Sequence, residues 1–272
     1  TAACALVAAK LQIPLVHLEA GLRSRDKAMP EEVNRLVTDC LSDVLWTPSP
    51  DADSNLIAEG VDPARISRVG NIMIDSFELV RPAIEAAGSA EEFGLERGGY
   101  GVVTLHRPSN VDDREELERL VAALVRVQQR LPLVFPVHPR TRVRLAAAEL
   151  DARLAAAGVR LVDPLSYVQF MSLVTGAAAA ITDSGGIQEE TTYLGIPCLT
   201  LRRNTERPIT IDEGTNRLVC AETLPDAVRR ALRAPRGAAR RPQYWDGQTA
   251  ARCVADLRRR SHDIEAGAIA AE

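Results

Sequence analysis

Residues 181–219 have the sequence ITDSGGIQEETTYLGIPCLTLRRNTERPITIDEGTNRLV and hold the clearest structural pattern in this chain of 272 residues. An apolar run from Ala177 to Ile181 predicts a buried parallel strand, which breaks at the turn DSGG. A predicted helix from Ile187 to Leu194 follows the turn. Ile196 to Leu201 then predicts a second strand, so the stretch forms a βαβ unit.

The turn of this unit is suited to an anion. A helix N-terminus presents free backbone N–H groups, and Gly185 and Gly186 let a ligand approach the backbone closely. Ser184 is placed to cap the helix and to offer its hydroxyl to a phosphate. Glu190 can accept two ribose hydroxyls, and Arg207 provides a fixed cation for a diphosphate. Taken alone, the tetrapeptide DSGG leaves a purely geometric role for its Ser and Gly equally open.

The overall composition excludes several classes of protein. The chain has 33 basic and 37 acidic residues and a net charge of −4, whereas a nucleic-acid-binding protein normally shows a basic excess. Hydrophobic residues make up 46%, enough for a core, but no apolar run is long enough to cross a bilayer. The five cysteines are scattered, without metal-ligand spacing, which favours reduced thiols in a cytoplasmic protein and no metal centre.

Strands and helices alternate along the rest of the chain, which predicts an α/β protein with parallel sheets. The strand at 101–105 is followed by a predicted helix from about residue 112 to residue 130, and the strand at 133–137 by a predicted helix that ends near residue 157. The chain opens with a helical segment that lacks a cap, followed by a strand. We therefore expect the numbering to begin inside a domain.

Polar residues follow several predicted strands or begin helices. Glu19 comes after the strand that ends at Leu18, and His106 and Arg107 come after the strand at 101–105. Open α/β sheets bind ligands at such strand ends. Glu31 lies in the first turn of a helix, where electrostatics with the helix dipole explains a carboxylate without any chemistry. An isolated His or loop Glu is likewise more often structural than catalytic.

Five motifs in order resemble those of the non-hydrolysing UDP-N-acetylglucosamine 2-epimerases. They are HLEAGLR at 17–23, PEEVNR at 30–35, HRPSN at 106–110, DSGGIQEE at 183–190 and TERP at 205–208. The resemblance covers about residues 1–260. The chain departs from the family pattern at Ser109 and Ile209, where the family usually has Glu.

The resemblance implies a GT-B-like α/β fold with two Rossmann-like parallel-sheet domains around a cleft, the first incomplete. The predicted domains are a partial N-terminal domain at 1–70, a UDP-binding domain at 71–242, and a closing helix at 243–262 that packs back on the first domain.

The resemblance also implies the roles of individual residues. Glu19, Glu31 and His106 are the expected catalytic residues. The expected UDP-sugar contacts are Arg107, His138, Ser184, Gly185, Gly186, Glu190 and Arg207. No cofactor is expected, and the family suggests a homodimer.

The implied reaction interconverts UDP-GlcNAc and UDP-ManNAc at C2, by elimination of UDP and its re-addition through 2-acetamidoglucal. Three alternatives stay open: a GT-B glycosyltransferase with a separate acceptor, a hydrolysing relative that releases free N-acetylmannosamine, and a UDP-binding chain inactive through truncation. The family carries a further catalytic Asp upstream of Thr1, so we expect an incomplete site in this chain.

Overall fold

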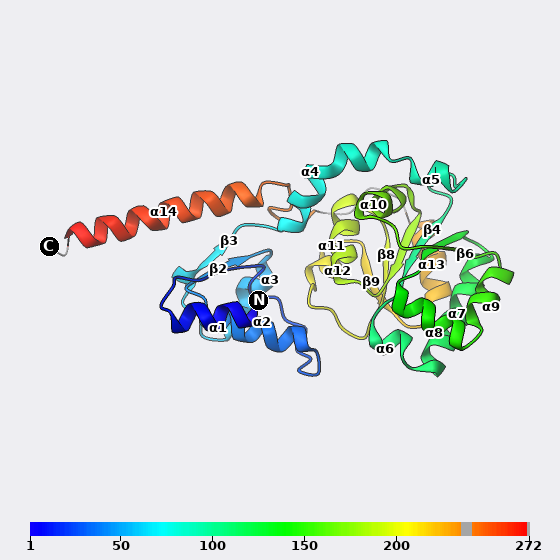
Figure 1. The fold of residues 1–272 in the computed structure, drawn as a ribbon. Helices are drawn as coiled ribbons and strands as arrows, with labels where there is room; N and C mark the ends of the chain where they lie inside the picture. Colours follow the sequence, from blue (N-terminus) through cyan, green and yellow to red (C-terminus); the bar gives the residue numbers. More distant parts are fainter. Residues whose placement is uncertain (235–240, 271–272) are drawn as a thin grey trace. The chain divides into compact units, whose positions relative to one another are not determined.

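The computed structural model describes residues 1–234 and 241–270, which form two compact units (Figure 1). Unit 1 comprises Thr1–Glu78, Glu206–Ile209 and Pro242–Glu272, and unit 2 comprises Leu79–Thr205 and Thr210–Arg241. The first division falls inside helix α4, later than the boundary predicted after residue 70. The start of α4 stays with unit 1 because Asp75 accepts hydrogen bonds from the backbone N–H groups of Thr249 and Ala250.

A three-stranded parallel sheet with the order β1-β2-β3 forms the centre of unit 1. Successive residues of a strand point to opposite faces. Leu45 accordingly packs on one face against Leu56, and Trp46 packs on the other against Cys253. The elements of unit 1 are α1 (Ala2–Lys10), β1 (Val16–Leu18), α2 (Pro30–Leu41), β2 (Val44–Thr47), α3 (Pro50–Ala58), β3 (Ile66–Arg68), the start of α4 (Ile72–Ala86) and α14 (Thr249–Ala270).

Helix α14 is tied to the sheet of unit 1 by Asp256. This carboxylate accepts hydrogen bonds from Trp46 Nε1 at 2.7 Å and from Ser67 Oγ at 3.1 Å. The helix continues to Ala270, beyond the end predicted at residue 262. Among the residues that the structure describes, no helix is both long and apolar enough to cross a membrane.

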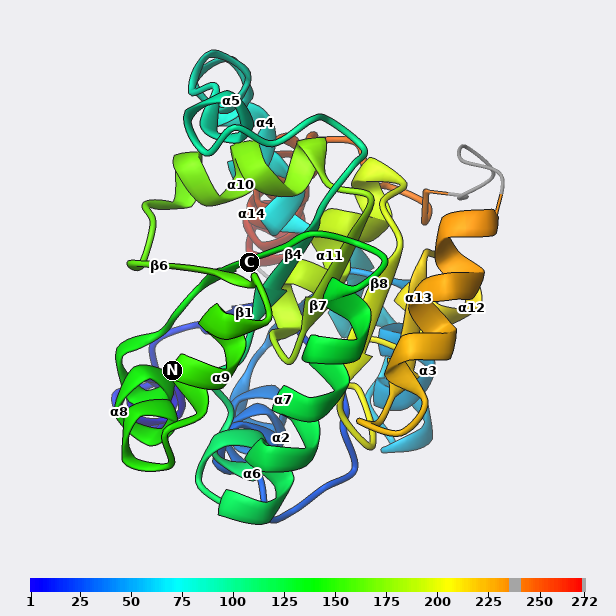
Figure 2. The ribbon, with the colours of Figure 1, turned by 90° about the vertical axis from the view of Figure 1, so that its right-hand side faces the viewer.

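A six-stranded parallel sheet with the order β6-β5-β4-β7-β8-β9 forms the centre of unit 2. Its strands are β4 (Gly101–Thr104), β5 (Leu133–Pro136), β6 (Arg160–Val162), β7 (Ala179–Thr182), β8 (Cys198–Leu201) and β9 (Asn216–Val219). In Figures 1 and 2 the helices α10 (Tyr167–Gly176) and α11 (Gly185–Leu194) lie on one side of these strands, and α7 (Arg114–Gln128) and α13 (Leu224–Arg233) lie on the other. The main core lies under α7 and α13, where apolar side chains of four strands are buried.

The helices of unit 2 differ from the prediction at two places. The helix predicted from about Asp112 to Arg130 is present, with the Asp113 side chain capping it by accepting from the Glu116 N–H, but the short helix at Pro108–Val111 before it was not predicted. The helix expected up to residue 157 breaks at Glu149, whose φ of 55° is left-handed. The helices are α5 (Ser89–Glu92), α6 (Pro108–Val111), α7 (Arg114–Gln128), α8 (Pro139–Ala147), α9 (Leu150–Ala156), α10 (Tyr167–Gly176), α11 (Gly185–Leu194), α12 (Ile209–Asp212) and α13 (Leu224–Arg233). The predicted α/β class with two parallel sheets is confirmed.

Candidate active site

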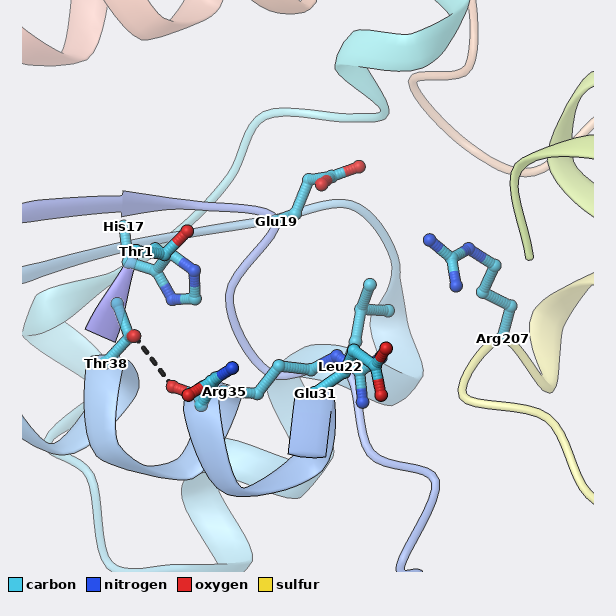
Figure 3. A pocket seen from close by; sticks show the side chains of 9 residues that line it. Thr1, His17, Glu19, Leu22, Glu31, Arg35, Thr38 and Arg207 are labelled. Carbon is cyan, nitrogen blue, oxygen red and sulfur yellow. Dashed lines mark hydrogen bonds between the residues drawn. The ribbon is translucent and has the colours of Figure 1, made fainter. Parts of the chain in front are cut away.

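Unit 1 contains a cavity of about 280 Å³ that holds two of the predicted catalytic carboxylates (Figure 3). Glu19 enters it from the turn after β1, and Glu31 enters it from the second residue of α2. Arg207 extends toward them from the segment that follows Thr205. The lining residues are Thr1, His17, Glu19, Leu22, Glu31, Asn34, Arg35, Thr38 and Arg207. A proton acceptor and a cation therefore share one cavity.

The turn that carries Glu19 is held in an uncommon conformation. Glu19 has a φ of 68°, in the left-handed region that few non-glycine residues adopt. The flanking residues hold it there, because the Ala20 N–H donates to Trp46 O at 3.0 Å. Gly21 follows with a φ of 81°, and a Cβ on it would lie 2.4 Å from Ala52 O. The backbone therefore fixes the direction of Glu19.

The cavity also contains His17, which the sequence prediction did not assign to the site. His17 Nδ1 lies 2.5 Å from Asp39 Oδ1, so this contact sets the orientation of the imidazole. Asp39 is buried, and its other oxygen binds Gly21 N–H at 3.1 Å and Arg23 at 2.7 Å. One carboxylate thus holds both His17 and the turn next to Glu19. The motif HLEAGLR, which contains both His17 and Glu19, was the sequence signal that could have found it.

The two neighbouring glutamates of α2 have different environments. Glu31 is exposed in the cavity, whereas Glu32 is buried. Glu32 accepts hydrogen bonds from the backbone of Ser24 and Arg25 and from the Arg35 side chain. Burial alone would raise the pKa of Glu32, but these backbone hydrogen bonds and Arg35 hold it below its ordinary value. Glu32 therefore anchors the preceding loop, and Glu31 is the one whose carboxylate reaches the cavity.

Unit 2 contains a second cavity, of about 230 Å³, beside the start of α11. It brings together the predicted residues His106, His138 and Ser184, and the two imidazole centroids lie 5.8 Å apart. Its lining residues are Thr104, Leu105, His106, Pro136, His138, Pro164, Leu165, Phe170, Ser184 and Ile187. Phe170 was not predicted. It provides an aromatic surface of the kind on which a nucleobase stacks.

Asp183 organises the residues around this second cavity. It is fully buried, and its carboxylate accepts from the backbone N–H groups of His106 and Arg107 and from Asn110 Nδ2, at 2.9–3.2 Å. His106 Nδ1 lies 2.8 Å away. Burial would raise the pKa of Asp183, but the His106 side chain and these backbone donors lower it. An ionised carboxylate thus fixes the loop that carries His106.

The glycine turn begins α11 as a βαβ unit requires. Ser184 is the N-cap residue, but its side chain makes no capping hydrogen bond, so the predicted cap is wrong. The Ser184 N–H donates to Thr182 Oγ1 at 2.9 Å, which ties the turn to the end of β7. At the other end of the helix, Gly195 adopts a φ of 72°.

Glu190 is buried on α11 and binds an unpredicted partner. Tyr167 at the start of α10 donates its hydroxyl to Glu190 Oε1 at 2.7 Å. Burial raises the pKa of the Glu190 carboxyl to about 7, although the Tyr167 hydrogen bond opposes this. Burial therefore favours the protonated form of this carboxyl over the ionised form.

The other predicted contacts are already engaged within the chain. The Arg107 side chain donates through Nε to Asp183 O at 3.1 Å. His138 is the N-cap of α8, where its Nδ1 accepts from the Arg140 N–H at 3.2 Å. Arg207 pairs with Glu206 at 2.5 Å. Gly185, Gly186, Arg107 and Glu190 do not line either described cavity. The structure leaves the roles of all these residues as predictions.

Two parallel sheets with a glycine turn at a helix N-terminus are typical of α/β nucleotide-binding proteins. A profile of the family described as UDP-N-acetylglucosamine 2-epimerase matches residues 1–258. The chain belongs to this family, so the predicted resemblance is confirmed.

Similar proteins include the UDP-N-acetylglucosamine 2-epimerase of Methanocaldococcus jannaschii, 40% identical over 79% of this chain and 60% of the relative. The UDP-2,3-diacetamido-2,3-dideoxy-D-glucuronate 2-epimerase of Pseudomonas aeruginosa is 39% identical over 81% of this chain and 61% of its own length. A crystal structure of the M. jannaschii enzyme with UDP-GlcNAc and UDP has a TM-score of 0.84 and 38% identity, covering 93% of this chain and 71% of that one.

The solved structures of the family that resemble this chain have the GT-B-like fold, which confirms the predicted fold class. The chain spans between 60% and 66% of the length of the first three curated relatives.

Proposed function

We propose that this chain carries the residues for reversible epimerisation of UDP-GlcNAc to UDP-ManNAc at C2. The observation that supports the proposal best is the cavity of unit 1, which holds the carboxylates Glu19 and Glu31 together with the Arg207 guanidinium. Carboxylates can exchange a carbon-bound proton, and a guanidinium can stabilise a leaving diphosphate. Epimerisation by elimination needs proton exchange at C2 and stabilisation of the diphosphate that leaves the adjacent carbon, C1.

The proposed reaction has two steps. In the first, one carboxylate takes the C2 proton, the C–H electron pair forms the C1=C2 bond of 2-acetamidoglucal, and UDP leaves C1 with the electrons of the C1–O bond. In the second, the C1=C2 electron pair takes a proton from the other carboxyl group at C2, on the opposite face, while a diphosphate oxygen of UDP forms the new bond to C1. Two faces need two proton carriers, and Glu19 and Glu31 are the candidates.

Nucleotide binding is assigned to unit 2. Phe170 offers a stacking surface for the base, and Glu190 offers a carboxyl group for the ribose hydroxyls. Ser184 and the N-terminus of α11 bind a phosphate, with His106 and His138 as neighbouring donors. Support comes from the M. jannaschii relative, whose structure was solved with UDP-GlcNAc and UDP.

The test is proton NMR of UDP-GlcNAc incubated with the protein in heavy water. We expect the C2 proton signal to disappear while UDP-ManNAc appears, without any acceptor. Because the chain spans only part of its relatives, the assay is run on this chain and on a fusion with the part of the M. jannaschii relative that the match does not cover. Free N-acetylmannosamine would instead indicate hydrolysis, and turnover only with an acceptor would indicate a glycosyltransferase. UDP binding without any conversion in either protein would indicate that the chain binds the nucleotide but does not catalyse the reaction.

A second substrate deserves the same assay. The P. aeruginosa relative is named for a diacetamido glucuronate, and its identity of 39% is close to the 40% of the UDP-GlcNAc relative. The same elimination at C2 would serve this sugar. Faster exchange with UDP-2,3-diacetamido-2,3-dideoxy-D-glucuronate than with UDP-GlcNAc would assign the chain to that substrate.

We also propose that the protein works as a homodimer in the cytoplasm. The family resemblance supports the dimer. Cys4, Cys40 and Cys220 are free, exposed thiols, which fit a reducing compartment. Light scattering should give the mass of two chains, and a single-chain mass at micromolar concentration would contradict the dimer.

A further inference from the structure

Gln188 is a buried polar residue in α11, one turn after the glycine turn. Its Oε1 accepts hydrogen bonds from Thr205 Oγ1 at 2.7 Å and from Asn216 Nδ2 at 2.9 Å. Its Nε2 donates to Ser184 O at 3.1 Å. Both acceptor positions of the amide are therefore occupied, and the side chain connects three separate segments of the chain.

Asn216 extends the same network to the other side of the TERP motif. Its Oδ1 accepts from Thr200 Oγ1 at 2.6 Å, and its Nδ2 also donates to Thr210 Oγ1 at 3.1 Å. Thr205 and Thr210 are the residues on either side of the segment Glu206–Ile209. The network thus holds both ends of the segment that contains Arg207, and Gln188 is its centre.

Burying such a polar network costs free energy. Buried amides and hydroxyls lose their hydrogen bonds to water, and hydrogen bonds within the protein compensate for this loss only when every partner is in place. Apolar side chains would fill the same space without this cost. What the polar network adds is geometry, because each hydrogen bond fixes one segment relative to the helix that begins at Ser184.

We infer that Gln188 is a positioning residue for the diphosphate of the nucleotide. It acts through Arg207, whose segment it clamps at Thr205 directly and at Thr210 through Asn216. This inference rests on the proposed nucleotide site and not on the epimerisation itself. A preorganised guanidinium loses less conformational entropy when a diphosphate binds, so the clamp increases affinity for the phosphates and not for the nucleoside.

The test compares the affinities of UDP and uridine for the present chain by calorimetry. We expect Gln188→Met to weaken UDP binding about tenfold, which corresponds to roughly 1.4 kcal/mol, and to leave uridine binding unchanged. Thr205→Val removes a single hydroxyl. It should also weaken UDP binding and not uridine binding, with less risk to folding. In an Arg207→Gln background, Gln188→Met should cause no further loss of UDP affinity, because it acts through that guanidinium.

Gln128→Met is the matched control. Gln128 is half-buried in the same unit, and its Oε1 accepts from Leu133 N–H at 2.7 Å, away from the glycine turn. This variant should lower stability but keep the ratio of UDP to uridine affinity. Equal losses for UDP and uridine in Gln188→Met, or full additivity with Arg207→Gln, would overturn the inference. A wild-type chain that binds UDP no better than uridine would overturn the nucleotide site together with it.

Discussion

Glu31→Gln should lower the rate of C2 proton exchange in UDP-GlcNAc by at least about a hundredfold, the contribution typical of a positioned acid or base. Glutamine keeps the size and polarity of the side chain but cannot take a proton from carbon. Glu31 is exposed in the cavity, whereas its neighbour Glu32 is committed to the loop at Ser24 and Arg25, so only the former is placed to exchange protons. Initial rates of deuterium incorporation, measured by NMR on whichever protein shows exchange, give the effect.

Glu115→Gln is the control for the alternative explanation, which is electrostatics at a helix start. Glu115 is the second residue of α7, as Glu31 is the second residue of α2, and both are exposed. Both substitutions remove a negative charge from the positive end of a helix dipole. Exchange rates should be unchanged in Glu115→Gln. If Glu31→Gln also retained its rate, Glu31 would be a structural residue and the two-carboxylate mechanism would be wrong.

Asp183→Ala should destabilise the protein by about 3–5 kcal/mol, the usual effect of removing one partner from a buried charged network. The carboxylate is fully buried and receives donors from His106, Arg107 and Asn110. Alanine would leave these donors without their acceptor and the loop after β4 without its anchor. Urea unfolding measures the loss. Asp163→Ala, at a surface carboxylate paired with Arg142, should have no measurable effect.

The same carboxylate predicts a dependence of stability on pH. The pKa of Asp183 is lower in the folded chain than its ordinary value, so the unfolded state binds the proton more readily. The stabilisation that the ionised Asp183 carboxylate gives the folded state is therefore complete above about pH 4. It is lost as the pH falls through the lower, folded-state pKa. Asp183→Asn should show a shallower loss of stability on acidification than the wild type. Parallel curves for the two proteins would contradict this assignment.

Local patterns in the sequence were sufficient to predict the fold class and most of the helices and strands. The run from Ala177 to Ile181 and the glycine turn predicted a strand and a helix start close to where they occur, and the helix predicted to end at Leu194 does end there. These features depend on backbone preferences and on the burial of neighbouring residues, which a sequence shows directly. The helix break at Glu149 was missed because one left-handed residue overrides helical periodicity.

Motifs also identified which residues to examine, but not how those residues are partnered. The family resemblance selects Glu31 over Glu32, but the physical difference between the two appears only when the loop at Ser24 folds onto Glu32. The pairing of His17 with Asp39 joins residues 22 positions apart, and that of Tyr167 with Glu190 joins residues 23 apart. No local pattern contains such pairs.

The chain's own residues thus establish a parallel α/β architecture, a glycine turn at a helix N-terminus and a set of acidic and basic candidates. Only the tertiary structure shows that Glu19, Glu31 and His17 line one cavity, that Asp183 fixes the His106 loop, and that Gln188 holds both ends of the segment carrying Arg207. The physical reason is that periodicity and propensity act over a few residues, whereas burial and hydrogen-bond partners depend on which distant segments the parallel sheets bring together.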